Sequence, residues 1–317
     1  MKVVVTSLFG DGFEESLKGE FPDLDLVFVS SEEDQAREIK DANVFMGAPS
    51  REVFIQADHL QWLHCPGTGI DTLTPITELV DSDVVLTNAR GPHTAPMADH
   101  VFSMCLAFAH RTNEMMADQK THSWDADKYS PTFIEMEDST MGILALGGIG
   151  MAVARRATGF GMDVYAVDKN PIAPPPGVID VWGLDRLDDL MAISDWLVIT
   201  APYTDDTSGM IGAEQLALMK PTSHMIIISR GGIVEENALF DTLKNNRIAG
   251  AGIDAFKNEP LPENSPWWDL ENVIISPHMS AVSKKMYEGR RDVFRENLRR
   301  FISNQPFIYV CDKSSGF

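Results

Sequence analysis

Cysteine is scarce in this sequence: its 317 residues include only Cys65, Cys105 and Cys311. Three cysteines, odd in number and far apart, indicate neither a disulfide framework nor a zinc site, and they favour a reducing cytoplasm. No apolar run is long enough to span a membrane, and no secretory signal is expected at the N-terminus. A length of 317 residues suggests two domains.

Basic residues are also few, since 26 Lys and Arg stand against 47 Asp and Glu, for a net charge of −21. This balance speaks against nucleic acid as a partner. His93, His100 and His110 lie close together in the sequence, but no Cys or carboxylate cluster joins them at ligand spacing. We therefore expect no metal site.

The stretch from Met141 to Asp168 contains the pieces of a dinucleotide-binding βαβ unit. In order, these are an apolar run at 141–146, a turn with Gly147, Gly148, Ile149 and Gly150, a helical segment at 151–157, and a second apolar run at 163–167 followed by Asp168. Such a turn brings backbone N–H groups to a pyrophosphate at a helix N-terminus, and the acid accepts hydrogen bonds from a ribose. Ala145 replaces the first glycine of the G-x-G-x-x-G pattern, which serves the tight turn.

Residues 1–90 alternate between strand-like and helix-like segments, which predicts a small α/β domain with a parallel sheet. Its expected strands are 3–5, 24–29, 43–46, 62–64 and 84–87. Ligands collect at the carboxyl ends of such strands. The loop at 66–71, with Gly67, Thr68 and Gly69, can present N–H groups to an anionic substrate, although a simple turn is the competing interpretation.

A long helix is predicted from Ala95 to Asp118, with Pro96 in its first turn. Residues 121–138 are then expected to form an irregular arm that includes Trp124.

Three polar side chains follow three apolar strands: Arg230 after 225–228, Glu259 after 251–254 and His278 after 273–276. The forked guanidinium of Arg230 suits a carboxylate, and the three side chains can converge on one crevice. A solvated strand end for Arg230 and a structural role for His278 remain the alternatives at this point.

The chain resembles the NAD-dependent D-isomer-specific 2-hydroxyacid dehydrogenases over nearly its whole length. The similar phrases are Pro-Gly-Thr-Gly-Ile-Asp at 66–71, Ala-Pro-Tyr-Thr at 201–204, Ser-Arg-Gly-Gly-Ile-Val-Glu-Glu at 229–236, Asn-Glu-Pro-Leu-Pro at 258–262 and Ser-Pro-His at 276–278. The resemblance implies a two-lobed α/β fold, with a Rossmann dinucleotide-binding domain inserted into a smaller flavodoxin-like substrate domain. The expected boundaries are 1–94 and 285–317 for the substrate domain and 95–284 for the NAD-binding domain. The helices at 97–118 and 284–303 would connect the two, and residues 310–313 would form a closing strand.

The resemblance also implies an oxidoreductase that transfers a hydride between NAD(H) and a small 2-keto or 2-hydroxy acid of the D-isomer, such as glyoxylate or hydroxypyruvate. Arg230 would bind the substrate, Glu259 would orient His278, and His278 would be the acid/base. Residues implied to bind substrate through the loop are Gly67, Thr68 and Gly69, and those implied to bind cofactor are Gly147, Gly148, Ile149, Gly150, Asp168, Pro202, Ser229 and Asp254. NADH is expected over NADPH because Asp168 repels a 2′-phosphate, although Lys169 beside it can accommodate one.

A homodimer is expected, because the family carries an interface arm in the segment that contains Trp124. A cytoplasmic location is expected from the scarce cysteines. A second hypothesis is a dinucleotide-sensing scaffold like the corepressors that share this fold, whose partner clefts and long tails have no obvious counterpart in these 317 residues. Formate dehydrogenase is disfavoured, because it usually carries Gln where Glu259 stands.

Overall fold

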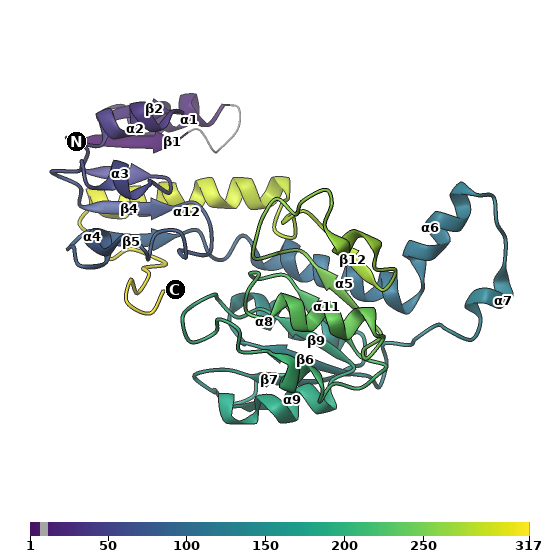
Figure 1. The fold of residues 1–317 in the computed structure, drawn as a ribbon. Helices are drawn as coiled ribbons and strands as arrows, with labels where there is room; N and C mark the ends of the chain where they lie inside the picture. Colours follow the sequence, from purple (N-terminus) through teal and green to yellow (C-terminus); the bar gives the residue numbers. More distant parts are fainter. Residues whose placement is uncertain (7–11, 317) are drawn as a thin grey trace. The chain divides into compact units, whose positions relative to one another are not determined.

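Two compact units make up the chain in this computed structural model, which describes residues 1–6 and 12–316. The first unit combines Met1–His93 with Ser283–Phe317, and the second is Thr94–Val282 (Figure 1). Each unit contains one parallel sheet covered by helices. The predicted α/β fold class is therefore confirmed.

The first unit has a five-stranded sheet in the order β2-β1-β3-β4-β5. Its strands are β1 Lys2–Thr6, β2 Asp25–Val29, β3 Val44–Met46, β4 Trp62–Cys65 and β5 Val85–Asn88, all parallel. Each strand predicted in residues 1–90 is present. Its helices are α1 Phe13–Glu20, α2 Glu32–Glu38, α3 Arg51–Phe54, α4 Thr77–Val80 and α12 Lys284–Ile302.

The long helix α12 belongs to the first unit because its apolar residues complete that core. Trp62 of β4 stacks on Phe294 of α12, with ring centroids 5.5 Å apart, and both side chains are fully buried. The predicted closing strand at 310–313 is wrong. Val310 forms a single antiparallel bridge with Thr87, and the chain turns immediately afterwards because the Asp312 carboxylate accepts hydrogen bonds from the backbone of Ser314.

The second unit has a seven-stranded parallel sheet in the order β12-β11-β10-β9-β6-β7-β8. Its strands are β6 Thr140–Leu144, β7 Asp163–Val167, β8 Asp180–Trp182, β9 Trp196–Ile199, β10 His224–Ile227, β11 Gly250–Ile253 and β12 Val273–Ile275. Its helices are α5 Thr94–Ala109, α6 Thr112–Lys120, α7 Ala126–Tyr129, α8 Gly148–Gly159, α9 Leu187–Ile193, α10 Ala213–Leu216 and α11 Glu236–Lys244, with short 3-10 helices at Leu184–Arg186 and Pro266–Asp269.

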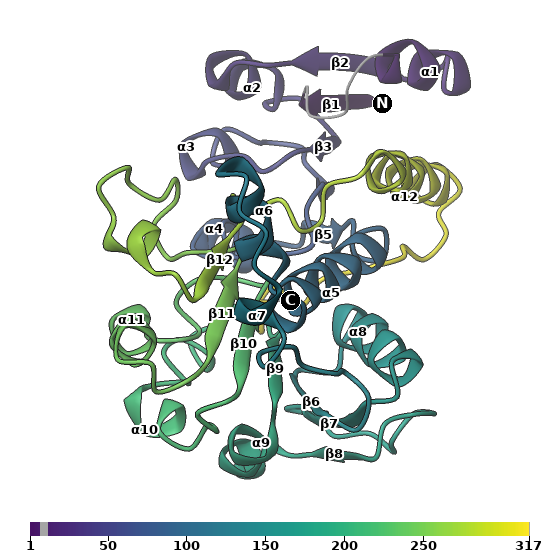
Figure 2. The same ribbon diagram turned by 90° about the vertical axis from the view of Figure 1, so that its right-hand side faces the viewer.

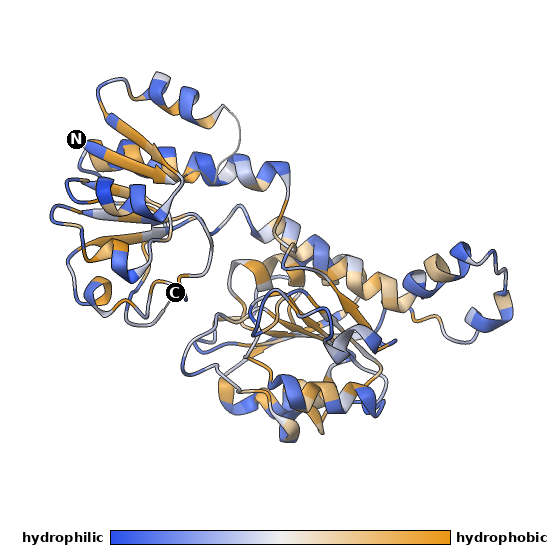
Figure 3. Ribbon diagram, turned by 45° about the horizontal axis from the view of Figure 1, so that its top comes forward, coloured by the Kyte–Doolittle hydropathy of each residue, from blue (hydrophilic) through white to orange (hydrophobic). Residues whose placement is uncertain are grey.

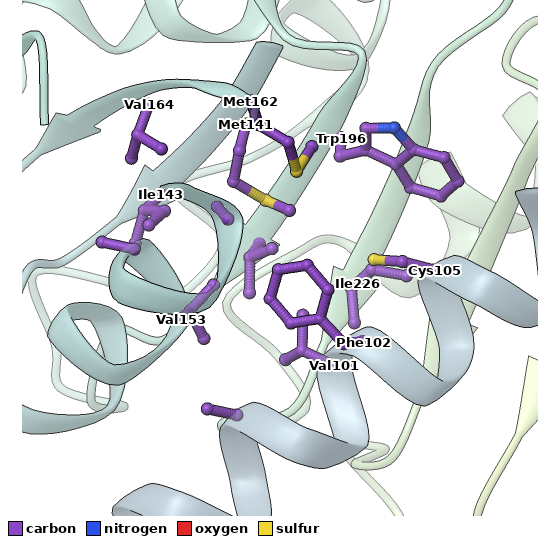
Figure 4. Packing of buried hydrophobic residues seen from close by; sticks show 14 of the residues in the cluster. Val101, Phe102, Cys105, Met141, Ile143, Val153, Met162, Val164, Trp196 and Ile226 are labelled. Atoms are coloured by element: carbon purple, nitrogen blue, oxygen red, sulfur yellow. The ribbon is translucent and has the colours of Figure 1, made fainter. Parts of the chain in front are cut away.

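Helices cover both faces of this sheet. Figure 2 shows α5 and α8 on one side of the sheet and α9, α10 and α11 on the other. Side chains of the first pair pack in one apolar cluster, and those of the other three helices pack in a second. Figure 4 shows Phe102 of α5 and Val153 of α8 close to Met141 of β6. Because both faces are covered, the central strands are mostly apolar, as the orange ribbons in Figure 3 show.

The helix predicted from Ala95 to Asp118 is interrupted. Helix α5 ends at Ala109, Arg111 takes a left-handed conformation with φ 51°, and α6 begins at Thr112. A residue in this conformation commonly ends a helix, which a smooth apolar period does not reveal. The predicted irregular arm also contains a short helix, α7, capped by the Asp125 side chain. Among the described residues, no helix is both long and apolar enough to cross a membrane.

Candidate active site

The strand order of the second unit reverses at β6, which lies between β7 and β9. In open parallel sheets, ligands bind outside the carboxyl ends of the strands at such a switch point. Thr200, directly after β9, donates a hydrogen bond from its hydroxyl to the carbonyl of Ala145 at 2.6 Å. The ends of β6 and β9 are thereby joined at this point.

The turn after β6 shows why each small residue stands where it does. Ala145 has a φ of 75°, a left-handed conformation that costs an L-residue roughly 1–2 kcal/mol and costs glycine little. A Cβ on Gly150 would lie 2.3 Å from the Ala145 carbonyl, so only glycine fits there. A Cβ on Gly147 would instead meet open space, which leaves room for a ligand against the backbone.

The N-terminus of α8 offers donors to an anion. The first backbone hydrogen bond of the helix runs from Met151 to Gly147. Among the described residues, the N–H groups of Gly148, Ile149 and Gly150 have no acceptor. Unsatisfied N–H groups and the helix dipole together favour a phosphate at this position.

Asp168 lies half-buried directly after β7, and its carboxylate supports the turn. It accepts hydrogen bonds from the backbone N–H of Leu146 and of Asn170, each at 2.8 Å. An ionised carboxylate has about four acceptor positions, so it can still accept from a ribose. Lys169 beside it forms an exposed ion pair with Asp206 at 2.9 Å.

Two further predicted cofactor residues follow strands on the other side of β6. Ser229, after β10, is buried, and its hydroxyl has no hydrogen-bond partner within the described part of the chain. A buried polar atom of this kind calls for an external partner. Pro202, after β9, is exposed, and its carbonyl accepts a hydrogen bond from Thr207 at 2.7 Å.

The sheet brings Arg230, Glu259 and His278 to one edge, because they follow the neighbouring strands β10, β11 and β12. His278 Nδ1 lies 2.7 Å from Glu259 Oε2, and the other Glu259 oxygen accepts from the backbone of Phe256 at 2.8 Å. The side chains of His278 and Glu259 are 42% and 34% exposed. The pair is thus fixed on one side and open to solvent on the other.

Gly231, directly after Arg230, packs against the loop that follows β11. A Cβ on Gly231 would lie 2.0 Å from the Phe256 carbonyl carbon. The space is filled by the backbone of the loop after β11. Gly231 therefore ties the loop of Arg230 to the loop of Glu259.

Asp254 is 1% exposed and directly follows β11. Burial disfavours its charged form, but hydrogen bonds from Ser276, Ser280 and the backbone of Met279 outweigh burial, so the pKa of Asp254 lies below its ordinary value. The carboxylate is ionised and accepts from at least three protein donors.

The predicted substrate loop lies in the first unit, after β4. The carbonyls of Gly67, Thr68 and Gly69 accept hydrogen bonds from Ala89, Asn88 and Cys65. Their three N–H groups have no acceptor among the residues described. A row of backbone N–H groups that are available in this way is suited to an anion.

Several residues that build the site were missed from the sequence: Thr200, Asn88, His100 and Ser276. Each acts through a hydrogen bond to a residue at least 20 positions away. No local pattern reveals such partners. The positions of Asn88, Thr200 and Ser276 at strand ends were the one available signal.

The chain is thus of the class that has a doubly wound dinucleotide-binding domain with Arg, Glu and His after neighbouring strands. The chain belongs to the D-isomer specific 2-hydroxyacid dehydrogenase family: residues 102–280 match the family's NAD binding domain. The predicted family is confirmed.

Relatives support this membership. Glyoxylate/hydroxypyruvate reductase B of Pectobacterium carotovorum subsp. carotovorum is 36% identical over 249 residues, which cover 78% of this chain and 76% of that protein. D-3-phosphoglycerate dehydrogenase of Methanocaldococcus jannaschii is 27% identical over 96% of this chain, which spans 58% of that protein's length. The structure of NADPH-dependent glyoxylate/hydroxypyruvate reductase from Sinorhizobium meliloti, in complex with NADP and sulfate, has a TM-score of 0.87 at 26% identity and covers 100% of this chain and 99% of that one.

Proposed function

We propose that the protein reduces a small 2-keto acid of the glyoxylate or hydroxypyruvate kind to the D-2-hydroxy acid, with NADH as the reductant. The observation that carries this proposal is the His278–Glu259 pair, 2.7 Å apart, which follows β12 and β11, while Arg230 follows β10, the next strand of the same sheet. One cation for a carboxylate and one proton donor are the two groups that keto-acid reduction requires.

The residues around the β6 turn fit a dinucleotide. We assign the pyrophosphate to the N–H groups at Gly147–Gly150 and the adenosine ribose to Asp168, with Pro202, Ser229 and Asp254 lining the nicotinamide side. The open space over Gly147 and the unpartnered hydroxyl of Ser229 support this assignment. The bound cofactor supplies the hydride.

The protein's own residues handle the negative charge and the proton. Glu259 accepts from Nδ1 of His278, so Nε2 is the nitrogen that faces the substrate. His278 donates its Nε2 proton to the keto oxygen as charge develops there. Arg230 holds the carboxylate with its fork and stabilises the same oxygen, and the N–H groups of Gly67, Thr68 and Gly69 are proposed to bind the carboxylate as well.

NADH is the proposed cofactor because the Asp168 carboxylate repels a 2′-phosphate, and because Lys169 is paired with Asp206. The S. meliloti relative is NADPH-dependent, so this point needs a direct test. A screen of 2-keto acids with each cofactor, followed by nicotinamide absorbance, is expected to give the higher kcat/KM with NADH. An equal or higher kcat/KM with NADPH would contradict the cofactor proposal, and a lack of turnover with every keto acid would contradict the activity.

A cytoplasmic homodimer is part of the same proposal. Cys65, Cys105 and Cys311 are buried and form no disulfide with one another, which suits a reducing compartment. The arm that contains Trp124 is the surface proposed for the subunit interface.

A further inference from the structure

His278 has an unusual backbone. Its φ is 53°, in the left-handed region, and a non-glycine residue there costs roughly 1–3 kcal/mol unless its surroundings hold it. The backbone conformation of this turn sets the direction in which the His278 side chain points. Whatever holds residues 276–280 therefore also sets the position of the imidazole.

Asp254 holds this turn from the end of the neighbouring strand β11. Its carbonyl accepts a hydrogen bond from the backbone N–H of His278 at 2.9 Å. Its carboxylate accepts from the N–H of Met279 at 2.8 Å and from the N–H of Ser280 at 3.0 Å. Three consecutive backbone donors are thus fixed by one buried residue.

The Asp254 carboxylate is in turn fixed from helix α5. The Ser276 hydroxyl lies 2.5 Å from Asp254 Oδ1, and His100 Nε2 lies 2.9 Å from the Ser276 hydroxyl oxygen. An ionised carboxylate only accepts, so the Ser276 hydrogen points to Asp254. The same hydroxyl must then accept from His100, which places a proton on His100 Nε2.

We infer that His100, through Ser276 and Asp254, is a positioning residue that holds His278 in its reactive place. The inference rests on the proposed function, because it assumes that His278 is the proton donor. It also gives Asp254 a role in addition to cofactor binding. With Ser276, Met279 and Ser280 as donors, three of about four acceptor positions on its carboxylate are already used.

The geometry distinguishes two substitutions at His100. Gln places an amide N–H near the position of Nε2 and can still donate to Ser276, whereas Phe keeps the ring but removes the donor. We expect His100→Phe and Ser276→Ala to lower kcat for glyoxylate reduction at least tenfold, with a dissociation constant for NADH within about threefold of the wild type. His100→Gln should recover most of the lost kcat.

The experiment compares these three variants with His110→Phe, a control at an exposed histidine just beyond the same helix. Circular dichroism checks folding, and fluorescence titration gives the NADH dissociation constant without turnover. The inference is overturned if His100→Phe and Ser276→Ala keep kcat within twofold, if His100→Gln is as impaired as His100→Phe, or if NADH affinity falls in proportion to kcat. His278→Gln separates the two proposals: an active His278→Gln enzyme refutes the proposed function, whereas an inactive one beside a fully active His100→Phe refutes only this inference.

Discussion

Arg230 is the cation expected to grip the substrate, and its planar fork is what matters at the residue scale. It follows the apolar strand β10, and its own Nη1 donates to the Ser229 carbonyl at 2.9 Å, which restrains the side chain. Lysine keeps the charge but presents a single ammonium that cannot grip two oxygens in a plane.

Arg230→Lys is therefore expected to lower kcat/KM for glyoxylate by roughly two orders of magnitude, or about 3 kcal/mol of transition-state stabilisation. The NADH dissociation constant should change little. Steady-state kinetics and a fluorescence titration measure the two quantities. Near-normal glyoxylate kinetics in this variant would show that Arg230 does not bind the carboxylate.

At the scale of elements, the loop after β4 depends on a residue at the end of β5. Asn88 is 2% exposed and donates from its amide to the Thr68 carbonyl at 2.6 Å. This bond fixes the orientation of the Thr68 carbonyl and therefore of the peptide unit to which it belongs. A loop that loses it would sample other orientations, at a cost to the anion site.

Asn88→Ala is expected to raise KM for glyoxylate about tenfold, or about 1.4 kcal/mol, with an unchanged NADH dissociation constant. Asn43→Ala is the matched control. The Asn43 side chain also forms a hydrogen bond, which it accepts from the Lys2 backbone, but it lies near the amino ends of the strands in the same unit. If both variants have the KM of the wild type, the loop does not depend on Asn88.

Strand β10 begins with a buried histidine that makes stability depend on pH. The His224 ring stacks on Trp196, with a centroid distance of 4.6 Å, and it also contacts the Phe108 ring. Burial, and secondarily the charge of Arg111, lowers the pKa of His224 to about 4. His224 is thus neutral in the folded protein over most of the acid range.

The lowered pKa of His224 determines whether the protein gains or loses stability as the pH falls. Above pH 6.5, both the folded and the unfolded states hold a neutral imidazole, and the full stability is present. As pH falls from 6.5 toward 4, the unfolded chain binds a proton that the folded state refuses, so the free energy of unfolding drops by about 1.4 kcal/mol per pH unit.

Removing this group should flatten the pH dependence. His224→Phe is expected to reduce the slope of unfolding free energy against pH by about 1.4 kcal/mol per unit between pH 6 and 4.5. His59→Gln, at an exposed histidine, is the control. Urea unfolding at several pH values measures the slopes, and equal slopes in His224→Phe and wild type would contradict the assignment.

At the scale of the whole molecule, the arm formed by α6 and α7 extends away from the sheet of the second unit (Figure 1). Trp124, between α6 and α7, is 97% exposed, and it lines a cavity of about 580 Å³ together with residues that include Met115 and Tyr129. An exposed tryptophan beside an open cavity is typical of a protein–protein interface.

The homodimer is tested by light scattering coupled to size-exclusion chromatography, which is expected to give twice the mass of one chain. Trp124→Ala should shift the mass toward one chain or lower kcat/KM several-fold, because tryptophan is a frequent interface anchor. Trp268→Ala, at a tryptophan that is 51% exposed, should do neither. A wild-type protein with the mass of one chain at working concentration would refute the dimer.

Strand β8 was not predicted, but local patterns in the sequence were sufficient for the strands of the first unit, for β6, β7, β10, β11 and β12, for the glycine turn after β6, and for the placement of Arg230, Glu259 and His278 at strand ends. These features depend on neighbours within a few residues: an apolar run makes a buried strand, and the residue that follows it lies at the carboxyl edge of the sheet. The roles of the three side chains came from the resemblance to a family, and they remain proposals.

The tertiary structure alone decided how these parts are held. The left-handed backbone of His278, the contact of Gly231 with the loop after β11, and the bond from His100 to Ser276, 176 positions away, leave no local pattern. The physical reason is that each is fixed by hydrogen bonds or packing between elements distant in the sequence, which bring partners together only when the sheet has formed.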